Sequence, residues 1–219
     1  LYLSEQFVPK DRLSEVMEDI FGAPISDTTL IKYEDGLAKN LKKFHAQTLQ
    51  WLKHTYVKHA DETSMRVEGK TQWIHVLSNN IATYLRYSAS RKSALEDVSG
   101  VLVHDHYSSY LKYGDVKHAF CNAHHLRELK ALVVHEQEDW AGEMYVLLQL
   151  MNRIAEDGSV EFEKAHRFKK IFEKILGRGV AYHEALPEMT DNGKKKRPGH
   201  NLALRLQKQQ EGVLRFLSD

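Results

Sequence analysis

The stretch Gly100-Val101-Leu102-Val103-His104-Asp105 joins a short apolar run directly to a carboxylate. A run of this kind is typical of a strand that is buried near the middle of a sheet. In an open α/β sheet, the carboxyl end of a central strand faces the functional crevice. We therefore expect a strand over residues 100–104 and a functional role for Asp105.

A second carboxylate, Asp61, lies in the middle of another predicted strand, residues 56–67. Because side chains alternate along a strand, Asp61 shares a face with His59 and Thr63. The neighbouring Glu62 points to the opposite face, where we expect it to pack or to form a pair. A turn at residues 68–70 and strands over 71–78 and 81–88 then predict an antiparallel meander.

The following residues complete an α/β pattern. We expect a short helix over residues 90–98, a helical turn over 107–112 and a fifth strand over 116–121. Three antiparallel strands, followed by helices that alternate with two more strands, form the element order of the ribonuclease-H-like (retroviral-integrase-like) fold, an α/β fold with a mixed sheet. Its active site uses an acidic residue in the middle of the first strand and another at the end of the fourth, where Asp61 and Asp105 lie.

Helices are predicted before this sheet region. One helix runs to Phe21 and ends at Gly22. A second, capped by Ser26, carries apolar residues at steps of three and four as far as Trp51. The pair resembles a helix-turn-helix, but no cluster of Arg or Lys marks the start of its second helix, so we favour an αα-hairpin.

Helices are also predicted after the sheet, over residues 126–154 (one helix or two in series), 162–176 and 201–217. We interpret the polar, basic stretch at 191–199 as a solvated loop, with a contact to the DNA backbone as the alternative. The chain then divides into a helical arm (residues 1–55), a catalytic core (56–130) and a helical insertion (131–219).

Composition alone leaves the function open. With 42% hydrophobic residues in 219, the chain can bury one substantial core. The net charge of +1 does not by itself indicate a nucleic-acid partner. A single cysteine, Cys121, excludes an intrachain disulfide, and no apolar run suits a membrane span. Because the first residue is Leu1, we interpret the sequence as part of a longer protein.

Paired carboxylates are suited to phosphodiester chemistry. Two Mg²⁺ or Mn²⁺ ions about 4 Å apart can neutralise charge on the attacking oxygen, the leaving oxygen and the phosphate. Both ions prefer oxygen ligands, and one Asp that bridges them with two flanking acidic groups is sufficient. We therefore expect Asp61 and Asp105 to be catalytic metal ligands on adjacent strands, close enough to share one cation.

Several strings of residues, in order along the chain, carry a family resemblance. The core contains His59-Ala60-Asp61-Glu62-Thr63, Trp73-Ile74-His75-Val76, Gly100 to Tyr107, and Cys121-Asn122-Ala123-His124-His125-Leu126-Arg127-Glu128-Leu129. The lead-in contains Phe21-Gly22 and Ile25-Ser26, and the tail contains Val213-Leu214-Arg215-Phe216-Leu217. Together they resemble the transposases of the insertion-sequence-sixty-six family, which are bacterial DDE-type transposases.

The resemblance implies that Asp61 and Asp105 are the first two members of the DDE triad. It also implies that the third, a Glu, lies in an Asn-Asn-x-x-Glu-Arg motif after the tail helix. No such motif occurs in residues 1–219, nor does the family's amino-terminal zinc-finger-like segment. We therefore expect these residues alone to bind metal weakly and not to transpose DNA.

Three further residues are candidates for support of the site. Cys121-x-x-His124 has the spacing of half a zinc site, but the chain has no second Cys. The resemblance places His124 near the active site, where it would orient the phosphate or the attacking water; alternatively, it caps the following helix. Arg127, one turn along, could meet a phosphate. Glu128 is a weaker candidate for the third carboxylate.

The implied activity is metal-dependent cleavage at the ends of an insertion sequence, followed by strand transfer. Water attacks first, and the freed 3′-hydroxyl then attacks target DNA. The implied partners are double-stranded DNA and a second copy of the chain, in the cytoplasm of a bacterium. Two alternatives stay open: another ribonuclease-H-like nuclease, such as a resolvase, and an inactive or domesticated remnant that binds DNA or self-associates.

Overall fold

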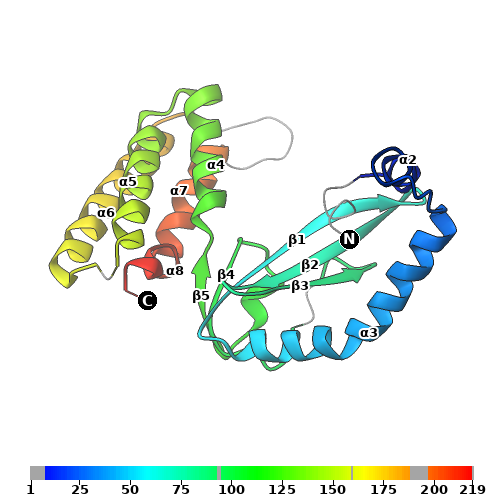
Figure 1. The fold of residues 1–219 in the computed structure, drawn as a ribbon. Helices are drawn as coiled ribbons and strands as arrows, with labels where there is room; N and C mark the ends of the chain where they lie inside the picture. Colours follow the sequence, from blue (N-terminus) through cyan, green and yellow to red (C-terminus); the bar gives the residue numbers. More distant parts are fainter. Residues whose placement is uncertain (1–7, 93–94, 159, 188–196, 219) are drawn as a thin grey trace. The chain divides into compact units, whose positions relative to one another are not determined.

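The computed structural model describes residues 8–92, 95–158, 160–187 and 197–218 (Figure 1). The chain divides into two compact units, Leu1–Trp51 and Leu52–Asp219. The first unit is helical, and the second contains the sheet and the later helices.

The first unit consists of α2 (Lys10–Phe21) and most of α3 (Asp27–His54). Helix α2 ends at Gly22, whose φ of 61° lies in the left-handed region that favours a residue without Cβ. Helix α3 begins after Ser26, whose hydroxyl accepts a hydrogen bond from the Thr29 backbone N–H at 3.3 Å. The predicted helices and the predicted cap are confirmed.

The second unit contains a five-stranded mixed sheet. Its strands are β1 (Val57–Val67), β2 (Lys70–Ser78), β3 (Thr83–Ser88), β4 (Gly100–His104) and β5 (Val116–Phe120). They lie in the order β3-β2-β1-β4-β5. Strands β1, β2 and β3 pair antiparallel, whereas β4 pairs parallel with both β1 and β5. The predicted meander and the two later strands are confirmed.

Strand β4 lies between β1 and β5 and is buried, as its apolar run predicts. Val101 and Leu102 are 2% and 0% exposed. The strand starts at Gly100, whose φ is 81°. Beside it, the Val101 N–H donates to the Tyr56 carbonyl at 2.7 Å. A carbonyl and a strand can approach this closely because Gly100 has no Cβ.

The helix predicted over residues 90–98 is wrong: the described residues 90–92 and 95–98 form bends and irregular chain. Hydroxyl groups compete here for the backbone donors that a helix would use. Ser88 Oγ accepts from Ser90 N, and Ser90 Oγ accepts from Lys92 N. In the same segment, the Leu95 N–H donates to the Tyr113 hydroxyl at 2.9 Å. Tertiary contacts therefore override local helix propensity in this connection.

The later helices follow β5, with a 3₁₀ turn η1 (Tyr110–Lys112) before that strand. Strand β5 leads into α4, and α5, α6 and α7 pack in sequence beside it (Figure 1). The elements are α4 (Asn122–Ala131), the π-helical turn η2 (Leu132–Glu136), α5 (Asp139–Glu156), α6 (Phe162–Glu184), α7 (Pro198–Lys208), α8 (Gln210–Leu214) and the 3₁₀ turn η3 (Arg215–Leu217). The predicted helices are confirmed, with the first in two parts.

These helices share one apolar core, in which Met144, Leu148, Phe172 and Leu206 are fully buried. Residues 191–196 of the predicted basic loop lie outside the described residues. None of the described helices combines the length and the apolar character that a membrane crossing needs.

Replacing Gly100 by Ala should destabilise the sheet at the β1–β4 pair. A Cβ at this position would lie 2.5 Å from the Tyr56 carbonyl oxygen, and the φ of 81° is strained for any L side chain. We expect the free energy of unfolding, measured by urea denaturation, to fall by about 2 kcal/mol or more. Gly114→Ala is the control, because no atom lies within 4 Å of a Cβ built there. Equal stability of the two variants would contradict the prediction.

Candidate active site

Asp61 and Asp105 come from neighbouring parallel strands. Residues 57–59 of β1 pair with residues 101–103 of β4. The same register, continued by two residues, sets Asp61 opposite the first residue after β4, Asp105. Paired strands lie about 4.8 Å apart. The expected adjacency of the two strands is therefore confirmed, and both carboxylates act electrostatically on the Tyr110 hydroxyl.

Each of the two carboxylates is oriented by one backbone donor. Asp61 is exposed, and its Oδ1 accepts from the Glu62 N–H at 2.9 Å. Asp105 is half-buried, and its Oδ1 accepts from the Tyr107 N–H at 2.8 Å. Within the described residues, the Oδ2 atom of each carboxylate makes no hydrogen bond or ion pair. One oxygen of each group is thus available to a ligand.

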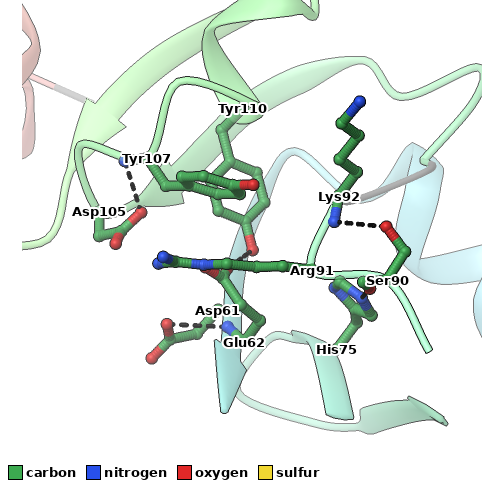
Figure 2. A network of polar contacts seen from close by, with 9 residues as sticks. All are labelled: Asp61, Glu62, His75, Ser90, Arg91, Lys92, Asp105, Tyr107 and Tyr110. Atoms are coloured by element: carbon green, nitrogen blue, oxygen red, sulfur yellow. Dashed lines mark hydrogen bonds and ion pairs between the residues drawn. The ribbon is translucent and has the colours of Figure 1, made fainter. Parts of the chain in front are cut away.

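Glu62 forms a buried network beside these carboxylates (Figure 2). Its side chain is only 1% exposed. Glu62 Oε2 accepts from the Tyr110 hydroxyl at 2.6 Å, and Oε1 accepts from Arg91 Nε at 2.9 Å. Burial, then the hydrogen bond to Glu62, and then the charges of Glu62, Asp105 and Asp61 raise the pKa of Tyr110, which keeps the phenol protonated as a donor. The expectation that Glu62 forms a pair is confirmed.

Arg91 belongs to the same network, although no sequence pattern predicted it. It lies in the connection from β3 to β4, and its guanidinium carbon lies 4.1 Å from the Tyr107 ring centroid and 5.1 Å from that of Trp73. The hydrogen bond to Glu62 raises the pKa of Arg91, so the group stays charged. The sequence around Arg91 contains no motif or spacing that would identify it, because its partners are distant in the sequence.

A cluster of buried and half-buried histidines lies around the first residues after β4. His104 Nε2 and His118 Nδ1 lie 2.8 Å apart, and the Nε2 atoms of His106 and His125 lie 2.6 Å apart. Burial lowers the pKa of His104 and His106 to about 4 and that of His125 to about 3. These rings are therefore neutral at pH 7 and place no positive charge beside Asp105.

The supporting candidates on α4 lie in different environments. The His124 N–H donates to the Cys121 carbonyl at 3.1 Å, and its buried Nδ1 has no hydrogen-bond partner among the described residues. Arg127 is exposed, with Nε donating to the Ala123 carbonyl at 3.3 Å. Both carboxylate oxygens of Glu128 lie 2.6 Å from Arg205 Nη2. Within the described residues, none of the three candidates bonds to Asp61 or Asp105.

An apolar cleft of about 440 Å³ opens on the sheet face that carries Asp61. Val57 and His59 contribute to it from β1, and alternation along the strand puts Asp61 on the same face. The other lining residues come from β4, β5 and the helices: Val101, Val103, Ala119, Phe120, Cys121, Asn122, Asn152, Ala155, Glu156, Gly212, Arg215 and Phe216. The cleft therefore lies on the same face of the sheet as Asp61, toward the amino-terminal end of β1.

The donor set fits a divalent cation in kind but is incomplete in number. Carboxylate oxygens without other partners are the ligands that Mg²⁺ and Mn²⁺ prefer. Among the residues that the structure describes, however, no group of three or more His, Cys, Asp or Glu is arranged to hold a metal ion. Asp61 and Asp105 would therefore need at least one further ligand.

Comparison with known protein families identifies the chain as a transposase: a family model described as "Transposase IS66 family" matches residues 3–219. Since the match spans nearly the whole sequence, the chain belongs to the IS66 family of transposases, and the resemblance noted in the sequence is confirmed. Searches of curated proteins and of solved structures returned no match.

Acid should destabilise the fold through His125, which is 0% exposed. Its pKa is lowered to about 3, first by burial and then by electrostatic interaction with His106, Arg205 and His124, of which the two histidines repel it only once they are protonated. The unfolded chain binds this proton more readily than the folded chain. The contribution of neutral His125 to the stability of the fold is therefore fully present above about pH 6.5 and is lost as the pH falls toward about 3. From pH 7 to about pH 5 we expect a loss of about 2 kcal/mol of unfolding free energy from this residue.

The measurement is urea denaturation of the wild type and of His125→Gln at both pH values. The Gln variant cannot titrate, so its stability should depend less on pH by that amount, even though its stability at pH 7 is lower. The same pH dependence in both proteins would show that His125 is not the group responsible.

Proposed function

We propose that this chain supplies the catalytic core of a DDE-type transposase, which cuts DNA at the ends of an insertion sequence and joins them to target DNA. Family membership supports transposition as the process. The observation that carries the proposal for the chemistry is the parallel register of β1 and β4, which sets Asp61 opposite Asp105. Two oriented carboxylates with free oxygens are suited to a metal-dependent phosphodiester reaction.

We also propose that the sheet is of the ribonuclease-H-like class. The strand order β3-β2-β1-β4-β5 supports this assignment, because a three-stranded antiparallel meander is followed by two parallel strands. The positions of the carboxylates support it as well: Asp61 lies in the middle of the first strand, and Asp105 follows the fourth.

In this mechanism the chain itself orients the carboxylates. The Glu62 and Tyr107 N–H groups fix Asp61 and Asp105 before any ligand binds, which lowers the cost of reorganisation. The neutral rings of His104 and His106 do not compete with a cation for these oxygens. Mg²⁺ or Mn²⁺, held by Asp61 and Asp105, would supply activation of the attacking oxygen and stabilisation of the leaving oxygen.

The third carboxylate of the triad is proposed to lie after residue 219, as the family resemblance implies. Glu128 is a poor substitute, because Arg205 already occupies both of its oxygens. The apolar cleft beside Val57 and His59 is suited to receive the segment that carries this Glu, since the cleft lies on the same face as Asp61. Packing of an amphipathic helix there would bury its apolar stripe.

DNA and a second copy of the chain are the proposed partners. A transposase must hold two DNA ends at once, which favours a homo-oligomer. Arg127 is exposed on α4 with a guanidinium that makes one backbone contact, so it can also meet a DNA phosphate. We keep His124 as a residue that supports the site, because its buried Nδ1 lacks a hydrogen-bond partner within the described residues.

Asp61→Asn and Asp105→Asn should each lower DNA cleavage by about 10³-fold, because a neutral amide removes the charge that holds the metal. The assay uses the full-length protein with Mg²⁺ and a duplex that carries the ends of the insertion sequence. Asp115→Asn, an exposed aspartate in the turn before β5, is the matched control and should cleave like the wild type. Addition of EDTA should abolish cleavage. Undiminished cleavage by Asp61→Asn would refute the assignment.

Strand transfer separates a transposase from another nuclease of the same fold. With precleaved ends that carry a free 3′-hydroxyl, we expect the full-length protein to join them to a target plasmid in Mg²⁺. Asp105→Asn should fail in this step as well, because the same carboxylates serve both reactions. Cleavage without any joined product would favour a resolvase or a related nuclease.

A further inference from the structure

The guanidinium of Arg91 contacts three side chains that are distant from it in the sequence. Nε donates to Glu62 Oε1 at 2.9 Å, and the Glu62 side chain is 1% exposed. The rings of Tyr107 and Trp73 lie 4.1 and 5.1 Å from the guanidinium carbon. One edge of the group is thus fixed by an ion pair, and its plane by two aromatic side chains. Few rotamers remain to be lost when a ligand binds.

The other edge of the guanidinium has no protein partner among the described residues. Neither Nη atom of Arg91 makes a hydrogen bond or an ion pair there, and the side chain is 45% exposed. Figure 2 shows this end of Arg91 pointing toward the side where the carboxyl groups of Asp61 and Asp105 lie. The charge of Asp105 also acts on Arg91. The unpaired end of the guanidinium therefore points toward the side on which the two carboxylates lie.

We propose that Arg91 binds the phosphate group that is cut, through its two Nη donors, as a catalytic residue beside Asp61 and Asp105. The inference rests on the proposed function. A planar fork of donors matches two non-bridging phosphate oxygens, and a guanidinium stays charged at any working pH. With Nε already paired to Glu62, the two Nη atoms form the edge that remains for such a contact.

The chemistry at this position favours phosphate over a further carboxylate. Asp61, Glu62 and Asp105 bring three negative charges into a small volume, and these would repel an approaching DNA strand. Arg91 supplies a positive group beside this cluster, which offsets that repulsion. A carboxylate ligand would add a fourth acidic group, whereas a phosphodiester is the substrate of the proposed reaction.

A purely structural role for Arg91 makes a different prediction. If Arg91 only braces the segment that holds Asp105, its loss would lower stability and metal binding but would not change the number of phosphates neutralised by the protein. The salt dependence of DNA binding reports that number directly, because each neutralised phosphate contributes about 0.9 to the slope of log K against log salt.

The test compares the full-length wild type with Arg91→Gln. Fluorescence anisotropy measures binding to a labelled random-sequence duplex in Ca²⁺, over roughly 50 to 200 mM KCl. A random sequence suffices, because phosphate contacts do not depend on sequence. For Arg91→Gln we expect about tenfold weaker binding at the lowest salt and a slope smaller by about 1. An unchanged slope would overturn the proposal.

Lys92→Gln is the matched control, because it removes the same charge one residue along. Figure 2 shows the Lys92 side chain pointing away from the two aspartates, so its slope should equal that of the wild type. An equal fall in both variants would indicate a general charge effect and would overturn the proposal. Arg91→Lys covers the case in which Arg91→Gln does not fold. It keeps the charge and the slope, but we expect several-fold weaker binding, and wild-type affinity would count against a planar contact.

Failure of the proposal for Arg91 can be distinguished from failure of the proposed function. The binding assay needs no cleavage, whereas the proposed function fails if Asp61→Asn cleaves as well as the wild type. Loss of cleavage in Asp61→Asn, together with an unchanged slope in Arg91→Gln, would remove only the role of Arg91.

Discussion

The parallel pairing of β1 with β4 is the constraint on which the site depends. It begins where the Val101 N–H meets the Tyr56 carbonyl, and it runs through residues 57–59 and 101–103. A slip by one residue would turn one strand's side chains to the other face. Asp61 and Asp105 would then lie on opposite sides of the sheet. Gly100 therefore supports the site from a distance, because it permits the close approach that sets the register.

The burial of Glu62 explains the irregular connection between β3 and β4. A buried carboxylate is costly unless hydrogen-bonded and paired. Tyr110 supplies the hydroxyl and Arg91 the charge, and each comes from a different side of β4 in the sequence. Arg91 can reach Glu62 and stack on Tyr107 because its segment is not a helix. The network thus connects the segments before and after β4 to Glu62 in the middle of β1.

The strands could be predicted because their pattern is local. An apolar run marks β4, and alternation marks β1 and β2, so Asp61 and Asp105 could be placed on their strands. The prediction of a helix over residues 90–98 was wrong because the conformation of this segment depends on side-chain contacts with residues distant in the sequence. Arg91 and Glu62 are 29 residues apart, and Tyr110 and Glu62 are 48 apart. Sequence periodicity indicates only how residues a few positions apart are arranged. It therefore could not predict this network.

Asp61 and Glu62, adjacent residues of β1, lie in different environments. Both oxygens of Glu62 are occupied, by Tyr110 and by Arg91, and the side chain is shielded from solvent. Asp61 uses one oxygen on a backbone N–H and is exposed. A cation that displaced the partners of Glu62 would leave the buried Tyr110 phenol without its acceptor, at a cost of about 1–3 kcal/mol. It would also break the ion pair with Arg91. A cation at Asp61 displaces only water. The alternation of the strand therefore favours Asp61 as the ligand and leaves Glu62 to hold Arg91 in place.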